Sequence, residues 1–92
     1  MRITVEISMY PLNEAFVGDI KDFILRLRQE DGLEVLTNQV STQVRGEFTR
    51  VTSALNRCMQ ESMERRGSMI FVAKYLNADL DISSAPRIEP AD

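Results

Sequence analysis

Residues 2–11 read RITVEISMYP, and this stretch decides the fold of the chain. Its apolar side chains fall at every second position, at Ile3, Val5, Ile7 and Met9, with polar side chains between them. Strict alternation of this kind is typical of a strand that buries one face and presents the other. Pro11 ends the pattern, because proline has no N–H to donate to a sheet.

Two amphipathic helices are predicted beyond this strand. Apolar residues recur at helical spacing up to about Arg28, with Asn13 placed to cap the helix at its start and Gly32 to stop it. A second helix is predicted over residues 49–66, with Gly67 as its terminator. The inner stripe of this helix comprises Val51, Leu55, Cys58, Met59, Ser62 and Met63.

Three more strands complete the pattern. Residues 33–36 and 40–47 are predicted to form a hairpin around Asn38, and residues 69–76 a final strand. Because that final strand is apolar on both faces at its start, we expect it to be central in the sheet or covered. The order strand–helix–strand–strand–helix–strand predicts a ferredoxin-like α+β sandwich, a four-stranded antiparallel sheet with two helices on one face. The other face must be polar, covered by a partner, or used for a ligand.

Length and charge divide the chain into one domain and a tail. The 92 residues leave room for a single domain, predicted over residues 1–76. That region carries ten acidic and ten basic side chains, whereas residues 77–92 carry four acidic and one basic, so this proline-containing tail supplies the whole net charge of −3. A nucleic-acid-binding protein would show a clustered basic excess, so no nucleic-acid partner is expected.

The chain has no histidine and a single cysteine, Cys58. These counts exclude an intramolecular disulfide, histidine-based catalytic triads and the common His/Cys metal sites, so no metal or other cofactor is expected. A lone cysteine on an amphipathic helix is expected to be a small core residue. Neither a signal-peptide pattern nor a run of ~20 apolar residues is present, so we expect a cytoplasmic protein without membrane contact.

The polar side of the first strand raises the functional question. In a ferredoxin-like sheet the first and third strands are neighbours, so their outward side chains share one surface. These side chains are Glu6, Ser8 and Tyr10 from the first strand and Ser41, Gln43 and Arg45 from the third. A carboxylate, hydroxyls, an amide and an aromatic ring could bind a flat, nitrogen-rich heterocycle. A solvated face, or a sheet-to-sheet contact between two copies, explains the same pattern.

Thr42 interrupts an otherwise apolar row in the third strand. Threonine is a good strand former, and a buried hydroxyl would take its partner from the backbone or from a ligand. Catalysis has less support, because nothing fixes the separation of Glu6 from Glu34 or Glu47, and the four glycines are dispersed rather than gathered in a phosphate loop. We therefore expect no enzymatic activity; an enzyme would have to use Glu6 as its general base.

Two distinctive segments are SMYPL at residues 8–12 and TNQVSTQVRG at residues 37–46. Together they resemble the YkoF-type domains that bind thiamine and hydroxymethylpyrimidine, and the resemblance extends in matching order over about residues 3–75. It implies a ferredoxin-like, non-enzymatic binder of thiamine or its pyrimidine moiety, acting in vitamin salvage, transport or sensing.

The resemblance also implies roles for single residues. Thr42 falls on the threonine that hydrogen-bonds the pyrimidine in the family, with Ser8 and Tyr10 on the strand beside it. Asn38 stands where an acidic residue is expected, and Glu6 brings a carboxylate that can pair with a ring nitrogen. The candidate ligand-binding residues are therefore Thr42, Ser8, Tyr10, Glu6, Asn38 and Ser41. Strict alternation puts Thr42 on the helix side and Ser8 on the open side, so both serve one pocket only where a bulge or a strand end redirects one of them.

Self-association follows from the same resemblance. Some members of the family fuse two repeats, whereas this chain has one, which implies a homodimer or a dimer of dimers with a two-fold interface. The alternative function is a structural or regulatory assembly module, in which the polar strand face is an oligomer contact and no metabolite binds.

Overall fold

The first strand lies inside the sheet of the computed structural model, which describes residues 1–14 and 16–90. It is β1, Arg2–Pro11, and it buries the alternating side chains Ile3, Val5, Ile7 and Met9 to between 0% and 8% exposure. The remaining elements are the helices α1, Phe16–Arg28, and α2, Phe48–Arg66, and the strands β2, Glu34–Thr37, β3, Thr42–Glu47, and β4, Met69–Leu76. The alternation of apolar residues therefore predicted this strand and its buried face correctly.

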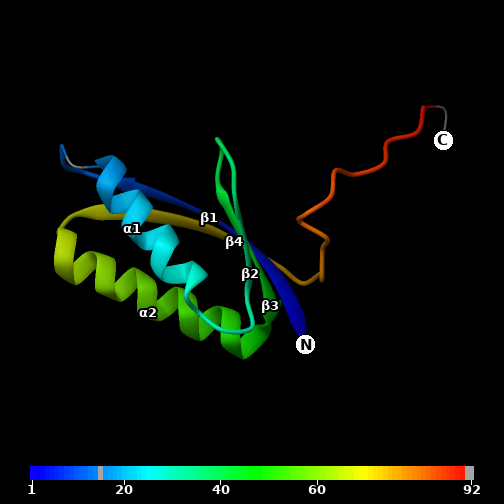
Figure 1. Ribbon diagram of the computed structural model, residues 1–92, viewed down its shortest axis with the longest axis horizontal. Coiled ribbons are helices and arrows are strands. Elements are labelled where there is room, and N and C mark those ends of the chain that lie inside the picture. Colours follow the sequence, from blue (N-terminus) through cyan, green and yellow to red (C-terminus); the bar gives the residue numbers. More distant parts are fainter. Residues whose placement is uncertain (15, 91–92) are drawn as a thin grey trace.

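The four strands form one antiparallel sheet in the order β2-β3-β1-β4. Both helices lie on the same side of this sheet (Figure 1), so the ferredoxin-like βαββαβ arrangement is confirmed. The core lies between the two layers, where the rings of Phe23 from α1 and Phe71 from β4 are 5.0 Å apart between centroids. Cys58 is buried there at 2% exposure, as expected.

The ends of the elements have local causes. Gly67 follows α2 with φ +83°, a left-handed conformation that glycine adopts without strain, and its N–H donates to the Met63 carbonyl. The prediction that strand 40–47 begins at Val40 was wrong. The Asn38 side-chain oxygen accepts the N–H groups of Val40 and Ser41, at 2.9 and 3.1 Å, so these two residues belong to the turn and β3 begins at Thr42.

Two predictions of burial fail for a shared reason. β4 was expected to be central or covered, but it is an edge strand, and Ile70 and Val72 are about half exposed on the face opposite the helices. Met63, expected on the inner stripe of α2, is 48% exposed. Apolar character alone does not fix burial, because much of a folded protein's surface is contributed by apolar atoms.

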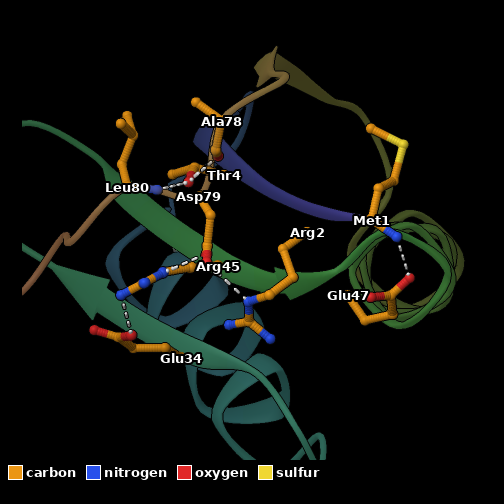
Figure 2. Close-up of polar contacts among 9 residues, drawn as sticks. All are labelled: Met1, Arg2, Thr4, Glu34, Arg45, Glu47, Ala78, Asp79 and Leu80. Atoms are coloured by element: carbon orange, nitrogen blue, oxygen red, sulfur yellow. Dashed lines mark hydrogen bonds and ion pairs between the residues drawn. The ribbon is translucent and has the colours of Figure 1, made fainter.

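The start of the C-terminal tail is bound to the open face of the sheet. The Thr4 hydroxyl donates to the Ala78 carbonyl at 2.8 Å and accepts from the Leu80 N–H at 3.0 Å, and Thr4 is only 3% exposed (Figure 2). Asp79 between them accepts from Arg2 at 3.1 Å and from Arg45 at 2.7 Å. Beyond this contact the chain leads away from the sandwich (Figure 1). Residues 91–92 of the predicted tail lie outside the described residues.

The ionic part of this contact depends on pH in a defined direction. Hydrogen bonding from Arg45 lowers the pKa of Asp79 from its ordinary value near 3.8. A carboxyl whose pKa is lower in the folded state stabilises that state above the ordinary value, and the stabilisation is lost as the pH falls through the lowered pKa. The attachment of Asp79 is therefore complete at neutral pH and weakens only in acid.

We expect Thr4→Val to lower the free energy of unfolding by about 1–3 kcal/mol. Valine keeps the β-branched shape that suits a strand and removes the hydroxyl that joins Ala78 and Leu80 to the sheet. Urea unfolding of the full chain measures the loss. Thr52→Val is the control, since that hydroxyl donates to the Phe48 and Thr49 carbonyls of its own helix. An equal loss in both variants would contradict a role for Thr4 in holding the tail.

Candidate binding site

β1 extends beyond the end of β3, the strand that pairs with one of its edges. Its pairing with β4 runs to Pro11 opposite Met69, but its pairing with β3 ends at Ile7 opposite Thr42. The hairpin of β2 and β3 then turns away from β1 (Figure 1), following the Asn38 turn. Residues 8–11 of β1 therefore have a strand neighbour on one edge only.

A cavity of about 190 Å³ lies at this free edge, between β1, α1 and the hairpin tip. Apolar side chains of Met9, Ile20, Phe23 and Ile24 form part of its wall. Ile7 and Val40 also line it, together with the polar residues Ser8, Tyr10, Thr37, Asn38, Gln39, Ser41 and Thr42. No carboxylate, lysine, arginine or thiol is among the described residues that line it, so the lining carries no charged side chain.

The structure brings together five of the six candidate residues. Ser8, Tyr10, Asn38, Ser41 and Thr42 all line the cavity. Thr42 reaches it from the helix side of the sheet and Ser8 from the open side. They meet because β3 ends at this point, without a bulge in the register of β1, which resolves the conflict that strict alternation posed.

Glu6, the sixth candidate, lies on the open face outside the cavity lining. One of its oxygens accepts from the Ser41 hydroxyl at 2.9 Å, and the other lies 3.5 Å from the Lys74 ammonium group. The Gln43 amide donates to the same Ser41 hydroxyl at 2.8 Å. Glu6 thus belongs to a polar chain that fixes Ser41 at the cavity rim, and it is occupied by protein partners.

Thr42 has a partner that sequence reasoning missed. Its hydroxyl lies 3.0 Å from the hydroxyl of Thr37, the residue directly opposite in the β2–β3 register, and Thr42 is 5% exposed. One hydroxyl donates to the other, so the pair still offers one free donor hydrogen and free acceptor lone pairs. The hairpin register is the signal that identifies Thr37, because two inward threonines placed opposite one another share a site.

Asn38 holds the turn. Its side-chain oxygen accepts two backbone N–H groups, and its own N–H donates to the Ser41 carbonyl at 3.1 Å. An asparagine that bonds the backbone two residues ahead in this way stabilises a tight turn. Asn38 therefore shapes the cavity by setting the direction of the hairpin tip.

The aromatic residues divide between wall and surface. Phe23 is 2% exposed, lines the cavity and packs on Phe71, so it combines a core role with a place in the wall. Phe16 is 51% exposed and is not part of the lining. Tyr10 lines the cavity while its side chain remains 53% exposed.

Other kinds of chemistry find no site in the parts of the chain that the structure describes. Over residues 1–14 and 16–90, no cluster of three His, Cys, Asp or Glu side chains is placed to hold a metal ion. Burial raises the pKa of the Cys58 thiol, which disfavours the reactive thiolate. None of the described helices is long and apolar enough to cross a membrane.

A family model described as the YkoF-related family matches residues 2–79. The chain belongs to the YkoF-related family. The match spans the whole sandwich and ends at Asp79, so most of the tail lies beyond it. No curated protein matches the chain.

Solved structures share the fold of this YkoF-related domain at low sequence identity. A protein from Thermotoga maritima, provisionally assigned to thiamine biosynthesis or salvage, superposes with a TM-score of 0.79 at 16% identity, covering 90% of this chain and 92% of that one. A Streptococcus pneumoniae protein gives 0.77 at 16% identity, with 91% and 92% covered. A domain of unknown function, DUF77, from Bacillus cereus gives 0.75 at 16% identity, with 90% and 85% covered.

We expect Asn38→Ala to lower the free energy of unfolding by about 1–2 kcal/mol, because two N–H groups of the turn lose their acceptor. Asn38→Asp should cost much less, since a carboxylate oxygen accepts the same bonds. Thermal and urea unfolding test both variants, with Gln39→Ala as the control at the exposed neighbouring position. Equal stability of the alanine variant and the wild type would contradict the turn role.

Proposed function

We propose that this cavity binds thiamine through its hydroxymethylpyrimidine moiety, or the free pyrimidine, and that the protein performs no chemistry on it. The observation that carries the proposal is the Thr37–Thr42 hydroxyl pair set beside the apolar wall of the cavity. Membership of the YkoF-related family and the thiamine assignment of the Thermotoga structure support the same ligand class.

The size of the cavity favours one ring. Pockets that enclose drug-sized ligands span roughly 300–1,000 Å³. The volume of about 190 Å³ is smaller, so a single substituted pyrimidine suits it better than the two rings of thiamine together. In this proposal the pyrimidine enters the cavity against Ile20, Phe23 and Ile24, and the thiazolium ring of thiamine remains at the mouth.

The polar groups complement an aminopyrimidine. Such a ring carries acceptor nitrogens, a donor amino group and a hydroxymethyl group that both donates and accepts. The threonine pair offers one donor and free acceptor lone pairs, and Ser8 adds a further hydroxyl. Because buried polar groups need partners, an uncharged ring with several polar edges fits this lining better than a hydrocarbon does.

The described lining contains no carboxylate, lysine or thiol, which supports binding without turnover. General acid–base catalysis needs a titratable side chain within hydrogen-bond reach of the reacting group. Glu6 is engaged by Ser41 and Lys74 outside the cavity, and Tyr10 is the titratable group that remains in the lining. In our proposal the protein therefore serves vitamin B1 salvage, transport or sensing by holding the compound.

We expect thiamine and 4-amino-5-hydroxymethyl-2-methylpyrimidine to bind saturably in calorimetry and to raise the melting temperature. Thr42→Val should weaken binding about tenfold, because it removes one hydrogen bond and leaves a polar edge of the ligand unpaired. Thr52→Val, at a threonine on α2 outside the cavity, should leave binding unchanged. If neither compound gave a binding heat in calorimetry or a rise in the melting temperature, the proposal would be refuted.

Self-association is the second part of the proposal. On the open face of the sheet Tyr10, Ile70 and Val72 are each about half exposed, and the register places Tyr10 opposite Ile70. Exposed apolar clusters of this kind mark association surfaces. We propose that two copies pair through this face with two-fold symmetry, as a dimer or a dimer of dimers.

We expect light scattering to give an oligomer mass for the wild type and the monomer mass for Val72→Glu, since each two-fold contact would bury two added charges. Val17→Glu is the matched control, at a valine 64% exposed on α1. A monomeric wild type would refute this part. An oligomer that binds neither compound would instead support the alternative, an assembly module without a ligand.

A further inference from the structure

The direction of each backbone group in β1 follows from two hydrogen bonds at its ends. In an antiparallel sheet a residue's N–H and C=O point to the same edge, and successive residues alternate. The Leu12 N–H donates to Ser68 at 3.1 Å, on the β4 side, and the Met1 carbonyl accepts from Phe48 at 2.8 Å, on the β3 side. With an unbroken register between them, odd-numbered residues of β1 direct their backbone groups toward β3.

Met9 is the first odd-numbered residue beyond the end of β3. Continuing the register of Ile7 with Thr42 would place Val40 opposite Met9. Val40 lies outside β3, donates its N–H to Asn38 and is 84% exposed, and no backbone bond joins it to Met9 in the described chain. The N–H and C=O of Met9 therefore point into the gap between β1 and the hairpin.

These two groups lie at the edge of the cavity. Met9 is 8% exposed and lines the cavity. Backbone donors and acceptors inside folded proteins nearly always have a hydrogen-bond partner, which can be a protein group, water or a ligand. The cavity at this edge is the space from which a partner for both groups can come.

We propose that the Met9 backbone is the specificity-determining contact of the cavity, with its N–H donating to a ring nitrogen and its C=O accepting from the neighbouring exocyclic amine. This inference rests on the proposed function. It assigns to β1 the edge of the ligand on which a ring nitrogen lies beside the exocyclic amine. The Thr37–Thr42 pair faces the gap from the hairpin and takes the other polar groups of the ring.

The contact selects between closely related rings. A 4-aminopyrimidine presents an acceptor nitrogen beside a donor amine, which matches the donor and acceptor of one strand residue. Replacing the amine by oxygen reverses this order, so a carbonyl of the ligand would face the Met9 carbonyl. Sites built around such hydrogen bonds reject analogues that leave them unpaired, and we expect the 4-oxo analogue to bind about 10–100-fold more weakly.

The test is amide hydrogen exchange measured by NMR on the full chain labelled with ¹⁵N-methionine. The chain has five methionines, so few signals need to be assigned. Without ligand the Met9 amide should exchange rapidly, and with saturating 4-amino-5-hydroxymethyl-2-methylpyrimidine at least about tenfold more slowly. Met59 inside α2 should be slow in both states. Met69 should be fast in both, because its N–H faces the free edge of β4.

Met9→Leu identifies the Met9 signal by removing it. The variant serves to assign this signal, and the substitution nearly conserves the volume of the side chain. Binding of the pyrimidine with no slowing at Met9, slow exchange at Met9 without ligand, or equal affinity for the 4-oxo analogue would overturn this inference and leave the proposed function standing. No binding of the pyrimidine to the wild type would overturn both.

Discussion

The unequal pairing of β1 is the constraint on which the rest of the molecule depends. One edge of this strand is paired up to Pro11 and the other only up to Ile7. A full-length β3 would close the sheet and fill the space beside α1 with backbone. Since the Asn38 turn withdraws Val40 and Ser41 from the ladder, a gap remains that is walled by core residues and edged by polar groups.

The fold was accessible from the sequence because its signals are local. Alternation in residues 2–11, glycine at the end of α2 and the order of elements each follow from short-range rules, and they agree with one another. The position of β4 was not accessible in this way. Ile70 and Val72 are apolar residues on a face that this chain leaves open. A strand with apolar residues on both faces has the same sequence pattern whether its outer face is covered or exposed.

The pattern of polar strand residues led to five residues that line one cavity, but it did not predict the geometry of that cavity. The meeting of Ser8 with Thr42 depends on where β3 stops. That end is set by side-chain bonds of Asn38, which no periodicity reveals. Thr37 was missed because a threonine in a short strand is explained by strand propensity, and only its register opposite Thr42 shows a shared role.

The open face of the sheet has two halves with different neighbours. Near the start of β1, Thr4 and Arg45 hold the tail segment that contains Asp79, so this half is already covered. Toward the end of β1, Tyr10 lies beside the exposed side chains of β4, and Tyr10 also lines the cavity. A second copy seated on this half would also cover the side of the cavity that Tyr10 lines. Under the proposed function, substituting Tyr10 would therefore disturb ligand binding and dimer contact together. Substitutions at Thr42, inside the cavity, and at Val72, outside it, would affect them separately.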